Sequence, residues 1–144
     1  MLTIEEDIQR SSLSESLQKA HLAFCRFLKD NAFSIEPEAD GNGWQIIYRN
    51  ELIGHTNYTN AGVWIDTCDF GGSDSANDTL KETTWAHARA CEQCGCGNQP
   101  GSDKIIFGRK FEHLCFAHLE FLNPDAETLE DIKRLLSLFR QTHI

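Results

Sequence analysis

Three of the six cysteines in this chain lie close together, as Cys91, Cys94 and Cys96, and a fourth, Cys115, follows after a glycine-rich loop and an apolar stretch. A structural zinc ion is held by four cysteine or histidine ligands, and a short loop that carries several cysteines brings their thiolates within reach of one ion. The spacing therefore predicts a structural zinc (Zn2+) site made of Cys91, Cys94, Cys96 and Cys115.

The cysteine run has the local form of a zinc knuckle. In Cys-x-x-Cys-Gly, the two intervening residues let both sulfurs point at one ion, and the glycine after Cys94 relieves crowding where backbone amides turn towards the sulfurs. Amide hydrogen bonds to the thiolates orient such ligands. Gly95 and Gly97 let Cys96 reach the same centre, and Cys115 would then attach a later strand pair to the loop.

Histidines near the cysteines leave the ligand set open. His87 precedes Cys91 by four residues and would share a face with it if a helix continued that far. His113 would point to the same side of a strand as Cys115, and His118 to the opposite side. A shell of three cysteines and one histidine is therefore an alternative to four cysteines.

The number of ligands decides the chemistry of such a site. Four sulfurs close the shell and leave no position for a water molecule, so the predicted ion is structural. An incomplete shell, with water in place of one sulfur and His87 or His113 as ligand or base, is the enzymatic alternative. A Cys91–Cys94 dithiol would be a redox site, but it follows a predicted helix, whose negative end disfavours the thiolate. Unliganded thiols and disulfides are the remaining alternatives.

Composition bounds the class of protein. The chain has 144 residues, of which 40% are hydrophobic and 24% charged, and we expect residues 1–144 to form a single globular domain. A net charge of −9 disfavours nucleic acid and anionic membranes as partners. The sequence carries no recognisable secretion signal and no apolar run near the ~20 residues of a membrane-spanning helix. It therefore predicts a cytoplasmic protein, whose reduced thiols favour metal over disulfides.

Hydrophobic periodicity predicts the elements before the cysteine run. A capping box at Thr3 to Glu6 begins a short helix, and apolar residues at three- and four-residue steps predict a longer one that Ser12 or Ser14 caps and that ends near Asn31. Alternating apolar residues and turn residues predict three antiparallel strands, joined as a meander, at 44–49, 52–58 and 63–68.

The second half of the chain is predicted to surround the cysteine run with a helix, a hairpin and another helix. Asn77 or Asp78 caps a helix that runs to about Ala90, and two strands follow at 104–107 and 111–116, with 118–121 as an extension or a third strand. The last helix starts with Asn123 as its cap and Pro124 in its first turn. The sequence predicts an α+β fold, in which three main helices pack on an antiparallel sheet.

The last third of the chain carries a longer pattern. It consists of the Cys-x-x-Cys-x-Cys run at 91–96, the segment Ile-Phe-Gly-Arg-Lys-Phe at 106–111, Cys115, and Asn-Pro-Asp at 123–125. This pattern resembles one in small uncharacterised bacterial proteins. The resemblance implies an α+β protein and implies no activity.

The remaining candidates favour binding over catalysis. The chain has no recognisable catalytic motif and no phosphate-binding loop. Its aromatic residues on the predicted strands and helices either line a ligand pocket or pack in the core; they are Trp44, Tyr48, Tyr58, Trp64 and Trp85. Cys25 and Cys68 are expected to pack in the core. The sequence therefore predicts a metal-stabilised module that binds a small molecule or a protein through its sheet.

Overall fold

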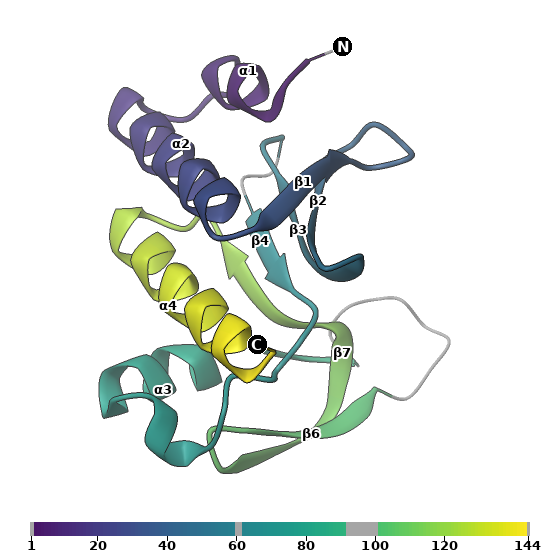
Figure 1. Ribbon diagram of the computed structural model, residues 1–144, viewed down its shortest axis with the longest axis vertical. Helices are drawn as coiled ribbons and strands as arrows, with labels where there is room; N and C mark the ends of the chain where they lie inside the picture. The colour runs from purple at the N-terminus through teal and green to yellow at the C-terminus, as the bar shows by residue number, and fades with distance from the viewer. Residues whose placement is uncertain (1, 60–61, 92–100, 144) are drawn as a thin grey trace. The chain divides into compact units, whose positions relative to one another are not determined.

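A computed structural model describes residues 2–59, 62–91 and 101–143 (Figure 1). The chain divides into two compact units, residues 1–63 with 121–133 and residues 64–120 with 134–144, and each unit is described by itself. The helices are α1 (Ile4–Gln9), α2 (Glu15–Asp30), α3 (Asp78–Ala86) and α4 (Ala126–Thr142), with a 3-10 turn at Ser73–Ser75. The strands are β1 (Phe33–Pro37), β2 (Trp44–Tyr48), β3 (Glu51–Asn57), β4 (Gly62–Ile65), β5 (Ala88–Ala90), β6 (Ser102–Ile106) and β7 (Arg109–Leu122).

Side-chain caps set the starts of both N-terminal helices. Thr3 and Glu6 form a reciprocal capping box at α1, in which each side chain accepts the backbone N–H of the other residue. At α2, the Ser14 hydroxyl accepts the backbone N–H of Leu17, and the helix ends at Asn31. Both helices confirm the sequence prediction.

The strands of the first unit form an antiparallel meander in the order β1-β2-β3-β4. Trp44, Ile46 and Tyr48 of β2 are buried in alternation with more exposed neighbours, as the sequence predicts. Strand β1 lies in a segment that the sequence analysis assigned to no strand. Only Phe33 of β1 is buried, and Pro37 ends it, so this edge strand lacks the alternating signal by which strands are recognised.

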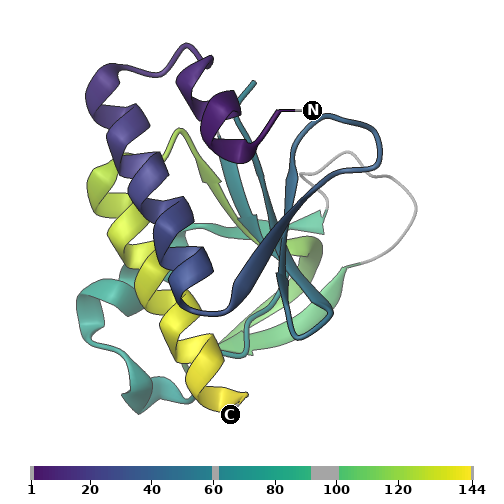
Figure 2. The same ribbon diagram turned by 45° about the horizontal axis from the view of Figure 1, so that its top comes forward.

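The core of the first unit packs α1 and α2 against the sheet. Its buried cluster comprises Ile4, Ile8, Cys25, Trp44 and Tyr58. Cys25 is a packing residue, as predicted, and burial raises the pKa of its thiol to about 12, which keeps it protonated and unreactive at neutral pH. The part of α4 that belongs to this unit runs beside α2, where the Lys133 ammonium lies 6.0 Å from the centre of the Phe27 ring (Figure 2).

The second unit is built around β7, which spans 14 residues. Its strand order is β4-β7-β5, and β6 also pairs with β7. The predicted segments 111–116 and 118–121 are therefore one strand. The β6–β7 hairpin turns at Phe107 and Gly108, whose φ angles are 48° and 83°, because Ile106 pairs with Arg109. Such a two-residue turn with positive φ matches the twist of the paired strands.

Helix α3 is shorter than predicted. The Asn77 side chain caps it by accepting the N–H of Leu80, as expected, but the helix ends at Ala86 instead of near Ala90. The next residues form β5, which pairs with β7, so a partner distant in sequence overrides the helix propensity of two alanines and an arginine.

This shorter helix corrects two inferences about the cysteine run. His87 and Cys91 do not share a helix face, because His87 is the C-cap of α3 and Cys91 follows a strand. For the same reason, no negative helix end lies directly before Cys91.

Helix α4 begins two residues later than predicted. Asp125, instead of Asn123, caps it: Asp125 Oδ1 accepts the backbone N–H of Thr128 at 2.8 Å. This hydrogen bond lowers the pKa of the Asp125 carboxyl. Asn123 has a φ of 49° and lies in the turn before the helix. The predicted apolar face is buried and comprises Leu129, Ile132, Leu135, Leu136 and Phe139.

The described strands pair in an antiparallel sheet and combine with four helices, which confirms the predicted α+β class. No helix within the described ranges is long and apolar enough to cross a membrane.

One buried residue of the first unit is expected to make its stability depend on pH. His21 of α2 is 1% exposed, and neither ring nitrogen forms a hydrogen bond with the described residues. Its ring meets Tyr58 edge-on, with 5.3 Å between ring centres. Burial lowers the pKa of His21, because the protonated ring would lose its hydration in the core.

We expect the free energy of unfolding to fall as the pH drops through the ordinary histidine pKa of about 6.5. The native state keeps His21 neutral while the unfolded chain takes up a proton, so stability is present above that pH and is lost below it. Replacing His21 with Leu should flatten the decline between about pH 7 and pH 5, because the variant has no ring to protonate. Urea unfolding across this range tests it, and an unchanged slope, with the other five histidines common to both proteins, would contradict it.

Candidate metal centre

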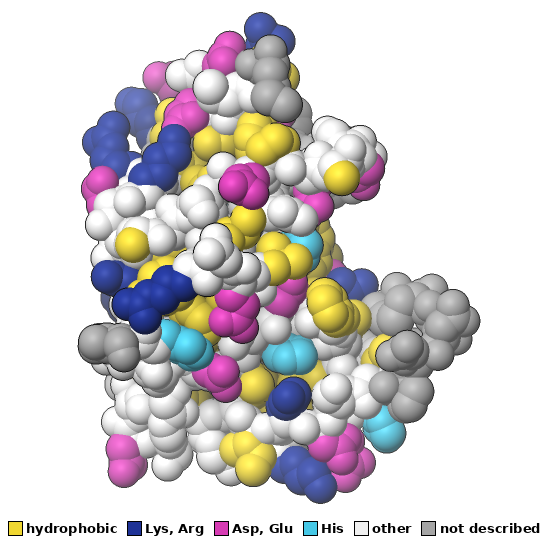
Figure 3. Space-filling model, turned by 45° about the vertical axis from the view of Figure 1, so that its right-hand side comes forward, with side chains coloured by type: hydrophobic (Ala, Val, Ile, Leu, Met, Phe, Trp, Pro, Cys, Tyr) yellow, Lys and Arg dark blue, Asp and Glu magenta, His cyan; other side chains and the backbone are white. Residues whose placement is uncertain are grey.

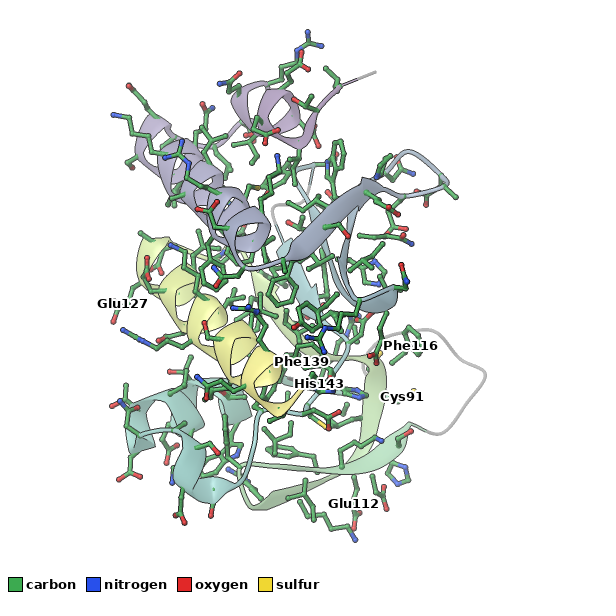
Figure 4. The ribbon with its side chains drawn as sticks, viewed as in Figure 1. Cys91, Glu112, Phe116, Glu127, Phe139 and His143 are labelled. Atoms are coloured by element: carbon green, nitrogen blue, oxygen red, sulfur yellow. The ribbon has the colours of Figure 1, made fainter. Side chains whose placement is uncertain are left out.

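The predicted metal ligands divide between described and undescribed residues. Cys91 and Cys115 are described, whereas Cys94 and Cys96 lie in 92–100, outside the described residues. Cys91 directly follows β5 and is half-buried, and Cys115 is a buried residue of β7. Both belong to the second unit. Figure 4 shows Cys91 near the part of β7 that carries Phe116, the residue after Cys115.

Two strand pairings bring both ends of the cysteine run to one position on β7. Ala90, the residue before Cys91, pairs with Leu114. Ser102, the first residue of β6, pairs with the same Leu114. Cys91 therefore directly follows one residue of this double pairing, Ala90, and Cys115 directly follows another, Leu114. The register thus gathers chain segments that are separated in sequence, as a shared metal site requires.

Gly101 fixes the returning end of the run against β7. A Cβ atom at this position would lie 2.2 Å from the Leu114 carbonyl oxygen and 2.4 Å from the His113 carbonyl carbon. No other residue fits there without moving backbone, so the glycine serves close approach of two chain segments. In the sequence, this residue is recognisable only as part of the glycine-rich loop before Cys115.

Strand β7 is irregular on both sides of Leu114. His113 has a φ of 57° and is exposed, and its backbone N–H donates to Asp103 Oδ1 at 3.2 Å. Leu114 and Cys115 are both buried, so the side chains do not alternate here. The inference that His113 and Cys115 share one side of a regular strand is therefore wrong.

The register of β5 against β7 explains this irregularity. Between the pairs Ala88–Leu119 and Ala90–Leu114, β7 has four residues where β5 has one. Extra residues of this kind form a bulge, which bends the strand and redirects its side chains. The bulge spans 115–118 and thus includes Cys115 and His118.

Two of the candidate histidines have their ring nitrogen Nδ1 anchored by a backbone carbonyl. His118 Nδ1 lies 2.8 Å from the carbonyl oxygen of Cys115, and His87 Nδ1 lies 2.8 Å from that of Thr83. A carbonyl only accepts hydrogen bonds, so Nδ1 donates and the lone pair of the neutral ring is on Nε2. Metal-binding histidines are commonly oriented in this way. The shell of three cysteines and one histidine thus stays open.

A complete shell needs the undescribed part of the run. Among residues 2–59, 62–91 and 101–143, no three side chains of His, Cys, Asp or Glu come together closely enough to hold a metal. A metal ion bound to Cys91 and Cys115 would therefore need further ligands from 92–100, where the sequence places Cys94 and Cys96. Zinc binding by these four cysteines stays a prediction.

A charged pair that the sequence analysis missed lies beside this region. Glu120 Oε2 accepts the indole N–H of Trp64 at 2.9 Å and lies 2.8 Å from Arg89 Nη1. The Arg89 side chain is 24% exposed and the Glu120 side chain 26%. The pair joins β5 to β7 next to the bulge. Nothing in the local sequence signals it, because it depends on strand register.

The aromatic residues proposed as a pocket are divided between the two units. Trp44, Tyr48 and Tyr58 are buried in the first unit, whereas Trp64 and Trp85 belong to the second. The Trp85 indole N–H donates to the Ile106 carbonyl at 2.7 Å, and the Arg109 guanidinium lies 5.5 Å from its ring centre. Both tryptophans of the second unit thus have structural hydrogen bonds.

A rival thiol site in the second unit lacks an activated nucleophile. Cys68, Asp69 and His143 line an open cavity of about 390 Å³. His143 Nε2 lies 3.8 Å from Asp69 Oδ2. Burial raises the pKa of the Cys68 thiol, and the Asp69 charge raises it further. A raised pKa keeps the thiol protonated, so this arrangement does not favour nucleophilic or redox chemistry.

Comparisons with protein-family models, with curated proteins and with solved structures found no match for this chain. Function must therefore be argued from the site, and the resemblance of the C-terminal pattern to bacterial proteins stays a prediction.

The close approach at Gly101 can be tested by adding one methyl group. Gly101→Ala should lower the free energy of unfolding by at least about 2 kcal/mol, because the new Cβ collides with backbone instead of a flexible side chain. Gly72→Ala is the matched control, since a Cβ there meets no atom within 4 Å and its φ is negative. Urea unfolding measures both, and equal stabilities would contradict the assigned contact.

Proposed function

We propose that this protein is a binding module whose second unit is stabilised by a structural zinc ion bound to Cys91, Cys94, Cys96 and Cys115. The observation that carries the proposal is the double pairing of Leu114 with Ala90 and Ser102, which returns both ends of the cysteine run to the neighbourhood of Cys115. Four thiolates close a tetrahedral shell and leave no coordination site for a substrate.

The strands around the cysteine run explain why a metal would be useful there. Strand β5 has three residues, and none of them is fully buried. Four of the five residues of β6 are exposed. Strands of this kind bury little apolar surface, so packing contributes little to holding them in place. An ion bound to Cys91 and Cys115 would link β5 to β7, and its binding free energy would add to folding stability.

The binding role rests on charge and on the absence of a catalytic motif in the sequence. The net charge of −9 favours cationic small molecules or basic protein surfaces over nucleic acid and anionic membranes. Zinc–thiolate ligation requires reduced cysteines, so the proposal places the protein in the cytoplasm.

The second candidate is a metal-dependent enzyme with an incomplete zinc shell. The favourable observation is the orientation of His118, whose Nδ1 donates to the Cys115 carbonyl and whose Nε2 can therefore bind metal. If a histidine and a water molecule replaced two sulfurs, the water would be available for hydrolysis. A thiol redox role has less support, because it rests on the Cys91-x-x-Cys94 spacing alone.

Tag-free protein should contain one zinc ion per chain by elemental analysis. A strong chelator should lower the melting temperature, because metal binding and folding are coupled. Cys94→Ser should lose zinc and lower the melting temperature by more than single surface substitutions do.

Cys68→Ser is the control, because it also replaces one cysteine, here a half-buried residue that lies outside the proposed ligand set. It should retain zinc and respond to the chelator as the wild type does. Equal melting temperatures of the wild type with and without chelator, or protein purified without metal, would count against the proposal.

A further inference from the structure

The first unit contains an open cavity that the proposed zinc site does not involve. It has a volume of about 580 Å³ and lies between the N-terminal segment and the hairpin that joins β1 to β2. Leu2, Pro37 and the accessible part of Trp44 supply apolar wall, and Asp7 and Glu38 supply charge. The volume is within the range of small-molecule sites in proteins.

Both charged side chains that line the cavity within the described residues are negative. Asp7 Oδ2 accepts the Trp44 indole N–H at 2.8 Å, and Asp7 Oδ1 accepts no hydrogen bond from the described residues. Figure 3 shows hydrophobic and acidic side chains between the N-terminal end, at the top of the view, and the projecting hairpin. The cavity thus presents a carboxylate oxygen that is held in place and still able to accept.

Glu38 is positioned from the opposite side of the cavity. Its Oε1 lies 2.5 Å from His55 Nδ1, and its Oε2 accepts the Gln45 amide N–H at 3.3 Å. The backbone N–H of Glu38 donates to the Gly43 carbonyl and its carbonyl accepts the Gly41 N–H, so the turn itself is hydrogen-bonded. A carboxylate oxygen has two lone pairs, so one partner leaves room for another donor.

The chemistry of the walls selects the ligand class. Two carboxylates favour a cation, and apolar wall favours an alkyl chain over a bare metal ion. No three His, Cys, Asp or Glu side chains among the described residues are grouped to hold a metal. An aliphatic ammonium ion fits both features of the cavity. Its alkyl chain would pack on the apolar wall, and its ammonium group would donate hydrogen bonds to the carboxylates.

We infer that this cavity, which we call the Trp44 cavity, binds an aliphatic amine in its protonated form. The inference rests on the proposed binding function for its meaning in the cell, and it names the site and the ligand class. Its residues are all in the first unit, so it does not depend on the zinc ion.

The test titrates the full chain with 1,5-diaminopentane and follows the Trp44 indole N–H signal by NMR and the heat by calorimetry. 1,5-Pentanediol, which has the same chain length and no charge, is the ligand control. We expect saturable diamine binding that shifts the Trp44 signal and no binding of the diol. The Asp7→Asn, Glu38→Gln double variant should weaken diamine binding at least tenfold while keeping both hydrogen-bond acceptors.

Glu36→Gln and Glu51→Gln together form the matched control variant. Both residues are exposed in the same meander, and neither lines the cavity. This double variant loses two negative charges, as the Asp7→Asn, Glu38→Gln double variant does. It should bind the diamine as the wild type does. If the two double variants weakened diamine binding equally, the net negative charge of the protein would explain the attraction, and the inference would be overturned. Diol binding as strong as diamine binding, or no diamine binding, would overturn it too.

A further arm distinguishes the source of the amine. Displacement of the diamine by Nα-acetyl-lysine amide would identify a lysine side chain as the recognised group, whereas binding of the diamine alone would identify a free amine. Repeating the titration on Cys94→Ser separates the two proposals. Unchanged diamine affinity in zinc-free protein supports the cavity on its own, and loss of affinity there would overturn its independence from the metal.

Discussion

Strand β7 of the second unit is the element on which the proposed metal centre depends, because Leu114 pairs with β5 on one side and with β6 on the other. The segment with the cysteine run follows one of these strands and precedes the other, so the residues on its two sides pair with the same position of β7. Gly101 makes the second attachment possible, since a side chain there would collide with β7. The bulge that follows turns Cys115 and His118 out of regular alternation.

The two units differ in how much buried apolar surface stabilises their strands. The first unit buries residues of two helices against its meander, and it includes a fully buried histidine without hydrogen bonds among the described residues. Burying ring nitrogens without hydrogen bonds costs stability, and the lowered pKa of this histidine links the stability of the core to pH. The strands next to the cysteine run in the second unit are short or exposed, so a metal cross-link would contribute most where packing contributes least.

The parts of the fold that sequence predicted are those with local signals. The capping box at Thr3 and the cap at Ser14 lie within four residues of the groups they satisfy, so both helices were placed correctly. The sequence does not signal β1, because a single buried residue makes no alternating pattern. The end of α3 differs from the prediction because Ala88 and Ala90 pair with Leu119 and Leu114, which are 31 and 24 residues away. In the candidate site, the cysteines are visible in sequence, whereas the double pairing of Leu114 and the Arg89–Glu120 pair depend on register, which a single sequence does not specify.

X-ray absorption at the zinc edge of tag-free protein tests the proposed centre most directly, because it counts the sulfur atoms around the ion. Cys91, Cys94, Cys96 and Cys115 predict four sulfurs at about 2.3 Å and no nitrogen or oxygen ligand. A first shell with water and histidine nitrogen, or a protein that holds no zinc, would contradict a structural four-cysteine site.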